Sequence, residues 1–340
     1  MIRIALVLAA FLFLAPASHA ASFDCAKAST PFEQAICSDD ALSAQDDILA
    51  QAYATALGGL SEDAAAEVKS AQRDWLAYAQ RVCSDDATLI KGDYTDDQKL
   101  CLASTFRSRV TDLEASRMSG GFRFFPVDRY HVEEDTEAEA DAFVKVADKQ
   151  FHSVRIDRDD EIAHTFNRAL EDMTASHGDF FEPGTTRIAS GDVSSDYDIR
   201  TAVSGVSTYR IGLTTTEYWY GHGAAHGNYF ITHRHFLSTE KRLLEASDIF
   251  AGEGWEATLG ELAVERIKAQ LGEGYFADSD EAVAGYAVDP ARWDFAEDGL
   301  VIQFNIYEVT AYAGGAPTVT IPWDDLRDVL AERAEEFAYY

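Results

Sequence analysis

Four cysteines lie in the first third of the chain, and no cysteine follows the last of them. An even number of cysteines without a Cys-x-x-Cys pair is typical of a disulfide framework in an exported protein, and it supports neither a zinc ribbon nor a thioredoxin-type redox motif. The sequence therefore predicts a small, disulfide-linked N-terminal unit. Local pairing is favoured among the three possible connectivities, although spacing alone does not decide it: Cys25 with Cys37, and Cys83 with Cys101.

The first 20 residues, MIRIALVLAAFLFLAPASHA, have the composition of a secretory signal peptide. Arg3 precedes an apolar run from Ile4 to Leu14, and small residues stand where a signal peptidase cleaves. The run is too short to span a bilayer, and no later stretch approaches the ~18 apolar residues that spanning needs. We expect residues 1–20 to be removed and the protein to be secreted, into the periplasm, without stable membrane insertion.

Residues 21–118 carry the signals of a small all-helical unit. Thr30, Pro31 and Glu33 form a capping box with proline at the first helical position, which predicts a helix start. Three further helices are predicted after Asp40, Ser61 and Thr95, each with apolar residues recurring at three and four positions. Two disulfides would stabilise so thin a core by restricting the unfolded chain. Nothing in this unit has a catalytic pattern.

The second half has the pattern of an α+β domain with an antiparallel sheet. We expect residues 119–145 to form an acidic linker or edge segment and residues 146–340 to form this domain. The predicted strands are Tyr197–Val203, Thr208–Tyr218, Asn228–Leu237, Leu300–Tyr307 and Pro317–Ile321, and the predicted helices are Asp159–Thr174, a short piece at Ser247–Phe250, Trp255–Leu271 and a closing helix at Asp324–Phe337.

The charge of the chain restricts its partners. Lys and Arg number 28 against 59 Asp and Glu, a formal net charge of −31 at pH 7. Such a surface repels nucleic acid and anionic lipid headgroups, and it accelerates association with cationic partners at low salt. Solubility alone would also account for the excess of acid.

The segment YGHGAAHGNYFITHRH contains four histidines: His222, His226, His233 and His235. A zinc-binding H-x-x-x-H pair needs a helix, but glycines surround His222 and His226, which predicts a loop. His233 and His235 would point to the same face of a strand, a geometry that can hold zinc, although a third ligand and a carboxylate base are not evident. Hydrogen-bonded strand histidines are the commoner case, so we expect no metal here and keep a four-histidine zinc centre as the alternative.

A second distinctive segment, YEVTAYAGG, covers residues 307–315. It leaves a predicted strand, carries Tyr307 and Tyr312, and turns on Gly314 and Gly315. A protruding loop of this kind can present an aromatic anchor to a partner. The alternative is a β-turn whose tyrosine packs into its own domain.

The N-terminal residues FDCAKASTPFEQAICSDDALSAQDDILAQAYATAL, followed by AQRDWLAYAQRVC and a last helix with Arg107 and Arg109, resemble the LprI-like lysozyme inhibitor family. The resemblance implies a secreted helical module, and lysozyme inhibition is described for some members. Family members often carry an Arg-Asp pair where this chain has Ala79-Gln80, so no role of that pair is carried over.

The C-terminal segments EYWYGHGAAHGNYF, LLEASDIF and GLVIQFNIYEVTAYAGGAPTVTIPWDDL resemble the C-terminal domain of RsiV-like anti-sigma factors, which bind lysozyme. The resemblance includes Ala225-His226-Gly227 and the 307–315 loop. It implies a partner-binding site formed by the residues Tyr307, Glu308, Tyr312, Gly314, Gly315 and His226. This chain has Ala311 where family members tend to have proline, which leaves the loop less preorganised.

Together these features predict a secreted, non-enzymatic protein that needs no cofactor and binds lysozyme, inhibiting it by steric occlusion. Two alternatives remain open. One is a metal-dependent envelope hydrolase that uses the four histidines, and the other is an envelope module that binds peptidoglycan or another protein. The sequence does not indicate which lysozyme type or which domain is involved, nor the oligomeric state.

Overall fold

The computed structural model describes residues 21–177, 180–182, 185 and 187–338. The expected signal peptide at residues 1–20 lies outside the described residues. Within the described part of the chain, no helix combines the length and the apolar character needed to cross a bilayer.

The N-terminal region is helical, as predicted. Every α-helix in it begins at a side chain that accepts a hydrogen bond from the backbone of the first turn: Thr30, Asp39, Ser61 and Thr95. After the short turn η1 (Cys25–Lys27), the helices are α1 (Pro31–Ser38), α2 (Asp40–Leu57), α3 (Glu62–Ala79) and α4 (Asp96–Leu113). The predicted capping box of Thr30 and Glu33 is present.

Both disulfides join cysteines that are close in the sequence. Cys25 is bonded to Cys37, and Cys83 to Cys101. The first pair fixes η1 to the end of α1, and the second fixes the 83–95 loop to the first turns of α4. The favoured local pairing is therefore confirmed.

The middle of the molecule is a seven-stranded sheet in the order β1-β2-β3-β4-β5-β6-β7. Its strands are β1 (Met118–Ser119), β2 (Phe122–Glu134), β3 (Val146–Ile156), β4 (Ser195–Val206), β5 (Arg210–Gly221), β6 (Asn228–Leu237) and β7 (Arg242–Leu243). Helix α5 (Glu161–Ala175) makes the crossover between β3 and β4, the one parallel pair among the described strand pairs. The predicted fold class, a helical unit followed by an α+β region with a mainly antiparallel sheet, is confirmed.

The long strands β2 and β3 were not predicted. All of β2 lies within residues 119–145, the range expected to be an acidic linker or edge segment. Its first residues do not alternate between buried and exposed, because helices cover the strand and the sheet continues beyond it: Phe125 and Val127 pack into the core of the helical region, whereas Phe122 and Phe124 pack with α5. The boundaries 21–118, 119–145 and 146–340 remain predictions.

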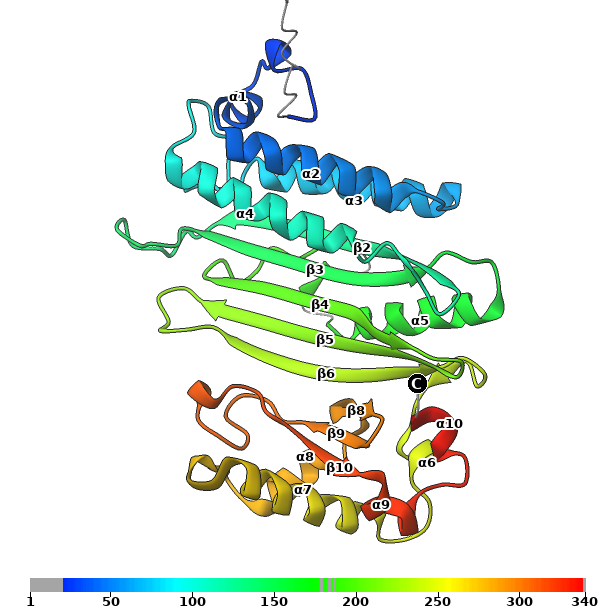
Figure 1. Ribbon diagram of the computed structural model, residues 1–340. Helices are drawn as coiled ribbons and strands as arrows, with labels where there is room; N and C mark the ends of the chain where they lie inside the picture. Colours follow the sequence, from blue (N-terminus) through cyan, green and yellow to red (C-terminus); the bar gives the residue numbers. More distant parts are fainter. Residues whose placement is uncertain (1–20, 178–179, 183–184, 186, 339–340) are drawn as a thin grey trace, which may run out of the picture.

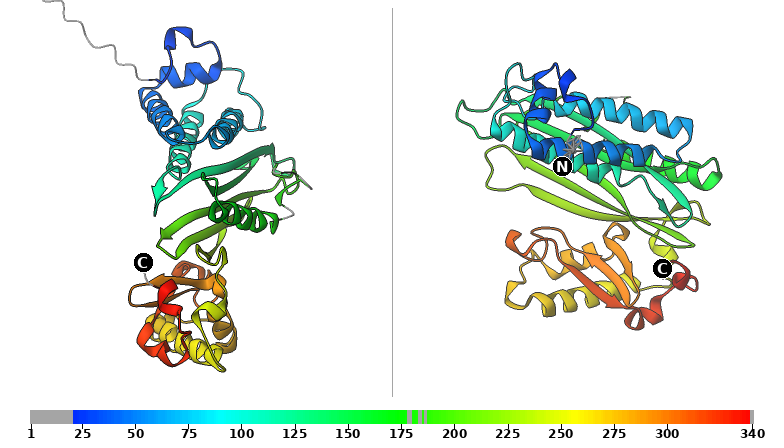
Figure 2. Two further views of the ribbon diagram at one scale, coloured as in Figure 1. Left: turned by 90° about the vertical axis from the view of Figure 1, so that its right-hand side faces the viewer. Right: turned by 45° about the horizontal axis from the view of Figure 1, so that its top comes forward.

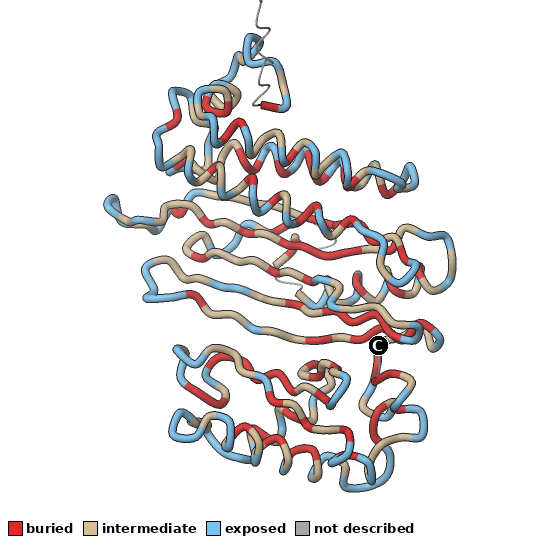
Figure 3. Tube along the Cα trace, in the orientation of Figure 1, coloured by how far each residue is buried: buried red, intermediate tan, exposed pale blue. Residues whose placement is uncertain are grey.

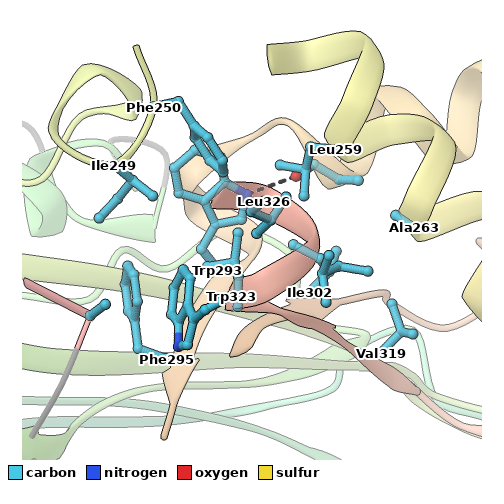
Figure 4. Packing of buried hydrophobic residues seen from close by; sticks show 14 of the residues in the cluster. Ile249, Phe250, Leu259, Ala263, Trp293, Phe295, Ile302, Val319, Trp323 and Leu326 are labelled. Carbon is cyan, nitrogen blue, oxygen red and sulfur yellow. Dashed lines mark hydrogen bonds between the residues drawn. The ribbon is translucent and has the colours of Figure 1, made fainter. Parts of the chain in front are cut away.

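The C-terminal region begins after β7 and contains a second sheet in the order β10-β9-β8. It comprises α6 (Ala246–Ile249), α7 (Trp255–Leu271), η3 (Gly272–Gly274), α8 (Asp280–Ala287), η4 (Pro290–Arg292), β8 (Trp293–Ala296), β9 (Gly299–Gln303), η5 (Tyr312–Gly314), β10 (Thr318–Pro322), α9 (Trp323–Leu326), η6 (Arg327–Val329) and α10 (Ala334–Ala338). The strand expected over Leu300–Tyr307 stops at Gln303. The core of the C-terminal region contains several tryptophans and phenylalanines, and Figure 4 shows Trp293 packed edge-on to Phe250.

The expected closing helix at Asp324–Phe337 is wrong, because the chain divides there into α9, η6 and α10. Leu330 has an extended backbone and pairs with Phe250. The backbone of Ala331 donates to Ile249, and that of Ala251 donates to Val329. These tertiary hydrogen bonds replace the helical ones at the centre of the segment, which local helix propensity cannot anticipate.

The three regions are stacked in sequence order (Figures 1 and 2). Helices α3 and α4 lie along β2 and cover that side of the sheet, and the C-terminal region lies beyond β6. Both long borders of the sheet are therefore covered, while the loops at its two ends and parts of β5 and β6, such as Trp219 and Phe230, remain exposed.

Candidate interaction site

The loop between β9 and β10 has a defined shape that depends on Glu308. The Glu308 carboxylate accepts a hydrogen bond from the backbone of Asn305 at 2.6 Å and pairs with Arg292 at 2.7 Å. The turn that it closes holds Tyr307 at a φ of +66°, an uncommon conformation for a residue with a side chain. As a result Tyr307 projects outward and is 51% exposed. Glu308 thus shapes the loop and already has a cationic partner.

Asn305 attaches this loop to the main sheet. Its amide accepts a hydrogen bond from the Ile231 backbone at 2.7 Å and donates to the Ile231 carbonyl at 3.3 Å. The buried side chain takes the place of a neighbouring strand at this point of β6. The 307–315 loop is therefore held against the strand that follows the histidine-containing turn.

Tyr312 and Tyr307 meet His226 of the β5–β6 turn. The rings of Tyr312 and His226 are stacked with centroids 3.7 Å apart, and the Tyr312 hydroxyl donates to the Gly227 carbonyl at 2.7 Å. The Tyr307 hydroxyl lies 3.3 Å from Nε2 of His226. We call these three residues the aromatic cluster. Tyr312 is half-buried in it, so Tyr307 and His226 are its exposed members.

The glycines of both segments have steric reasons to be glycine. A Cβ at Gly227 would lie within 2.5 Å of the Tyr218 ring, and one at Gly314 would lie 2.5 Å from the Thr310 side chain. Gly315 has a φ of +71°, which disfavours a side chain. Of the six predicted partner-binding residues, three form the aromatic cluster, and Glu308, Gly314 and Gly315 shape its supporting loop. Whether any of them contacts a partner stays a prediction.

His222 is clamped between two carboxylates. Its Nδ1 lies 2.5 Å from Asp135, at the end of β2, and its Nε2 lies 3.1 Å from Asp196, on β4. Burial opposes the charged form, but the hydrogen bonds to Asp135 and Asp196 raise the pKa of His222 above its ordinary value. Both ring nitrogens are engaged, and the contact joins the β2–β3 loop to the β5–β6 turn.

His233 and His235 lie buried on one face of β6, as expected for alternate strand residues. Nδ1 of His235 accepts from Arg210 at 2.9 Å, and its Nε2 donates to the Trp293 carbonyl at 2.8 Å. Burial and the adjacent Arg210 lower the pKa of His235 well below its ordinary value, so the ring is neutral. His233 is hydrogen-bonded to Thr214, and burial lowers its pKa as well.

The four histidines therefore occupy different environments, each with its own hydrogen-bond partners. Over residues 21–338, with the omitted positions between 178 and 186 set aside, no group of three or more His, Cys, Asp or Glu side chains is arranged to hold a metal ion.

Charged residues are buried where the helical region meets the sheet. Arg109 of α4 is fully buried, forms an ion pair with Asp128 of β2, and donates to Gln72 of α3 at 2.9 Å. Burial would raise the pKa of Asp128, but Arg109 and His152 hold it below its ordinary value. The family resemblance had drawn attention to Arg109, and its burial makes it a structural residue of this joint.

A polar cavity of about 210 Å³ adjoins this joint, between α3, α4 and the first residues of β3. The Tyr78 hydroxyl donates to the Asp148 carboxylate at 2.9 Å, and Gln150 donates to the same group. Burial and the nearby Asp196 raise the pKa of Asp148 to about 7, despite the lowering effect of these hydrogen bonds. The contact between Tyr78 and Asp148 was not predicted, because the two residues are 70 positions apart in the chain.

Two models of known families match separate parts of the chain. Residues 25–113 match the family model "Lysozyme inhibitor LprI", and residues 247–324 match DUF3298, a family described as proteins of unknown function. The N-terminal resemblance is thus confirmed, and the C-terminal one is confirmed as a likeness to DUF3298.

Solved structures of DUF3298 proteins also align with the chain. A member from Bacteroides fragilis is 16% identical, with a TM-score of 0.45, over 65% of this chain and 98% of that one. A member from Pseudomonas aeruginosa is 11% identical, with a TM-score of 0.43 and the same two coverages. No curated protein matches the chain.

Proposed function

We propose that this protein is an extracytoplasmic binding protein that recognises lysozyme and inhibits it by occluding its glycan-binding cleft. The observation that carries the proposal is the match of residues 25–113 to the lysozyme inhibitor LprI family. The two disulfides in that region suit an oxidising compartment, and the periplasm is the compartment we propose.

The charge of the chain supports the same partner. Lysozymes are generally cationic, and a surface with a net charge of −31 would attract them over a distance set by the ionic strength. The buried Asp112 and Asp128 are paired with arginines, whereas acidic residues such as Glu137, Glu139 and Asp141 are exposed and contribute their charge to the surface. Electrostatic steering would raise the association rate more than it lowers the dissociation rate.

The aromatic cluster supplies a contact of the required kind. Tyr307 is held outward by a turn that Glu308 and Arg292 stabilise, so little conformational entropy is lost when a partner covers it. Tyrosine offers a large contact area together with a hydrogen-bonding hydroxyl. A rigid projection of this kind can block a cleft without any covalent step.

Binding is tested by biolayer interferometry with the immobilised mature protein and a chicken-type lysozyme in solution, at low and at physiological salt. We expect saturable binding whose association rate falls steeply with salt, while the dissociation rate changes less. Absence of binding at low salt would reject the proposal. Binding to isolated peptidoglycan without binding to lysozyme would favour the envelope-module alternative instead.

A further inference from the structure

The loop between β2 and β3 extends beyond the end of the sheet and is fixed at its base. The backbone of Asp135 donates to the Lys145 carbonyl at 2.8 Å and closes the loop. Asp135 is also held by His222, and the Lys145 ammonium lies 3.4 Å from Asp85 in the disulfide-linked loop of the helical region. Figure 1 shows this loop projecting from the same end of the sheet as the β5–β6 turn.

Phe143 stands on this projecting loop with its side chain entirely in solvent, at 102% relative exposure. Three acidic residues beside it are also exposed: Glu137, Glu139 and Asp141. In Figure 3 the outer part of the loop is coloured as exposed. A single exposed apolar residue is common, but this one contributes no burial to the fold and follows a stretch, residues 135–142, of acidic and small side chains.

Side-chain contacts connect this loop to the aromatic cluster through the β5–β6 turn. Asp135 binds His222, which begins the β5–β6 turn, and His226 at the other end of that turn stacks on Tyr312. Three loops from distant parts of the sequence thus form one border of the molecule, which we call the docking edge: residues 135–145, 221–227 and 307–315. The ion pair between Lys145 and Asp85 connects the docking edge to the LprI-like helical region.

We propose that the docking edge is one continuous binding surface for a cationic protein with a concave site, and that Phe143 is its apolar anchor. The inference rests on the proposed function. It extends that function, because it assigns the side chain that enters the partner's concave site to the β2–β3 loop and not to the 307–315 loop alone. Phe143 enters the concave site of the partner, while Glu137, Glu139 and Asp141 face the basic groups at its rim. Burying a phenylalanine ring that is fully exposed before binding gives a large apolar contribution at no cost to the fold.

The decisive experiment compares Phe143→Ala with Tyr209→Ala in the full mature chain, using lysozyme as the probe. Tyr209 is a half-exposed aromatic in the β4–β5 turn, at the opposite end of the sheet, and it is the matched control. We expect Phe143→Ala to raise the dissociation constant roughly tenfold or more, mainly through faster dissociation, and Tyr209→Ala to leave it unchanged. Phe143→Leu should retain most of the affinity, because it keeps an apolar side chain.

The melting temperature of Phe143→Ala should equal that of the wild-type protein, because the fully exposed ring makes no contact in the fold. An unchanged melting temperature then shows that the loss of affinity does not come from a loss of stability. Wild-type binding with an unchanged dissociation constant for Phe143→Ala would overturn this inference and leave the proposed function intact. No binding by the wild-type protein would overturn both.

The acidic part of the surface is tested by a matched pair of triple variants. Glu137→Gln, Glu139→Gln and Asp141→Asn together remove three charges from the docking edge. Asp328→Asn, Glu332→Gln and Glu335→Gln remove three exposed charges from the C-terminal segment. The first set should slow association severalfold more than the second at low salt. Equal effects would show that only the net charge matters and would overturn the role of these three residues.

Discussion

The two regions that flank the central sheet are attached to it in different ways. The helical region is joined through buried charges, with Arg109 paired to Asp128 and Arg200 paired to Asp112. The C-terminal region is joined through apolar packing and through the neutral His235, which accepts a hydrogen bond from the buried Arg210 and lies edge-on to Phe295. One sheet thus has a joint with ion pairs on one side, the charged joint, and on the other side an apolar joint in which the buried Arg210 is hydrogen-bonded to a neutral histidine.

This difference determines how each joint responds to change. A buried ion pair is strongly directional, and removing one partner leaves an uncompensated charge, whereas apolar packing loses free energy in proportion to the area removed. The charged joint should therefore be the more sensitive to single substitutions and to pH.

The largest expected effect is that of Arg109→Ala. The substitution leaves Asp128 buried without its cation, and we expect the free energy of unfolding to fall by about 3–5 kcal/mol. Urea denaturation followed by circular dichroism measures it. Arg107→Ala, an exposed arginine one half-turn earlier on α4, is the control and should change stability by less than about 0.5 kcal/mol. Equal, small effects would show that the charged joint is not a stabilising element.

Removal of the disulfide between Cys83 and Cys101 should have the next largest effect. The double substitution Cys83→Ser, Cys101→Ser removes a cross-link that restricts the unfolded chain. We expect it to lower the free energy of unfolding by about 2–4 kcal/mol. Thiol titration of the denatured, unreduced wild-type protein should detect essentially no free cysteine. If the helical region and the rest of the chain unfold in separate transitions, only the helical transition should shift.

The pH response beside the charged joint should depend on Asp148. The pKa of Asp148 is raised from 3.8 to about 7, so between these values the folded protein holds a proton that the unfolded chain has released. The free energy of unfolding should therefore decrease as the pH rises through this window and level off above it. Asp148→Asn should lessen that decrease and raise the melting temperature at pH 8. An unaltered pH profile in the variant would contradict this assignment.

The smallest expected effect concerns Tyr312, which is already half-buried against His226. Tyr312→Ala should weaken lysozyme binding by an amount on the order of 1–3 kcal/mol, through faster dissociation. A lowered melting temperature with unchanged affinity would identify Tyr312 as a packing residue only. Tyr307→Ala separates the two roles, because Tyr307 is the more exposed member of the cluster and should affect affinity with little effect on stability.

Features set by neighbouring residues could be predicted from the sequence, and features set by distant ones could not. The helix starts at Thr30, Ser61 and Thr95 follow from capping side chains, and the disulfides join nearby cysteines. The strand β2 was missed because contacts with the helical region and with α5 hide its alternation. The clamp on His222 was also missed, since Asp135 is 87 residues away. The loop at residues 307–315 was found from its sequence, but which of its tyrosines projects depends on Glu308 and Arg292.

The central claim is tested most directly by the rate at which lysozyme hydrolyses a cell-wall glycan in the presence of increasing amounts of the mature protein. The account predicts that the rate falls toward zero near one equivalent at low salt and that Phe143→Ala requires severalfold more protein. An oligosaccharide that fills the lysozyme cleft should weaken the binding of the mature protein to lysozyme. An unchanged hydrolysis rate at a tenfold excess of the wild-type protein would contradict the account.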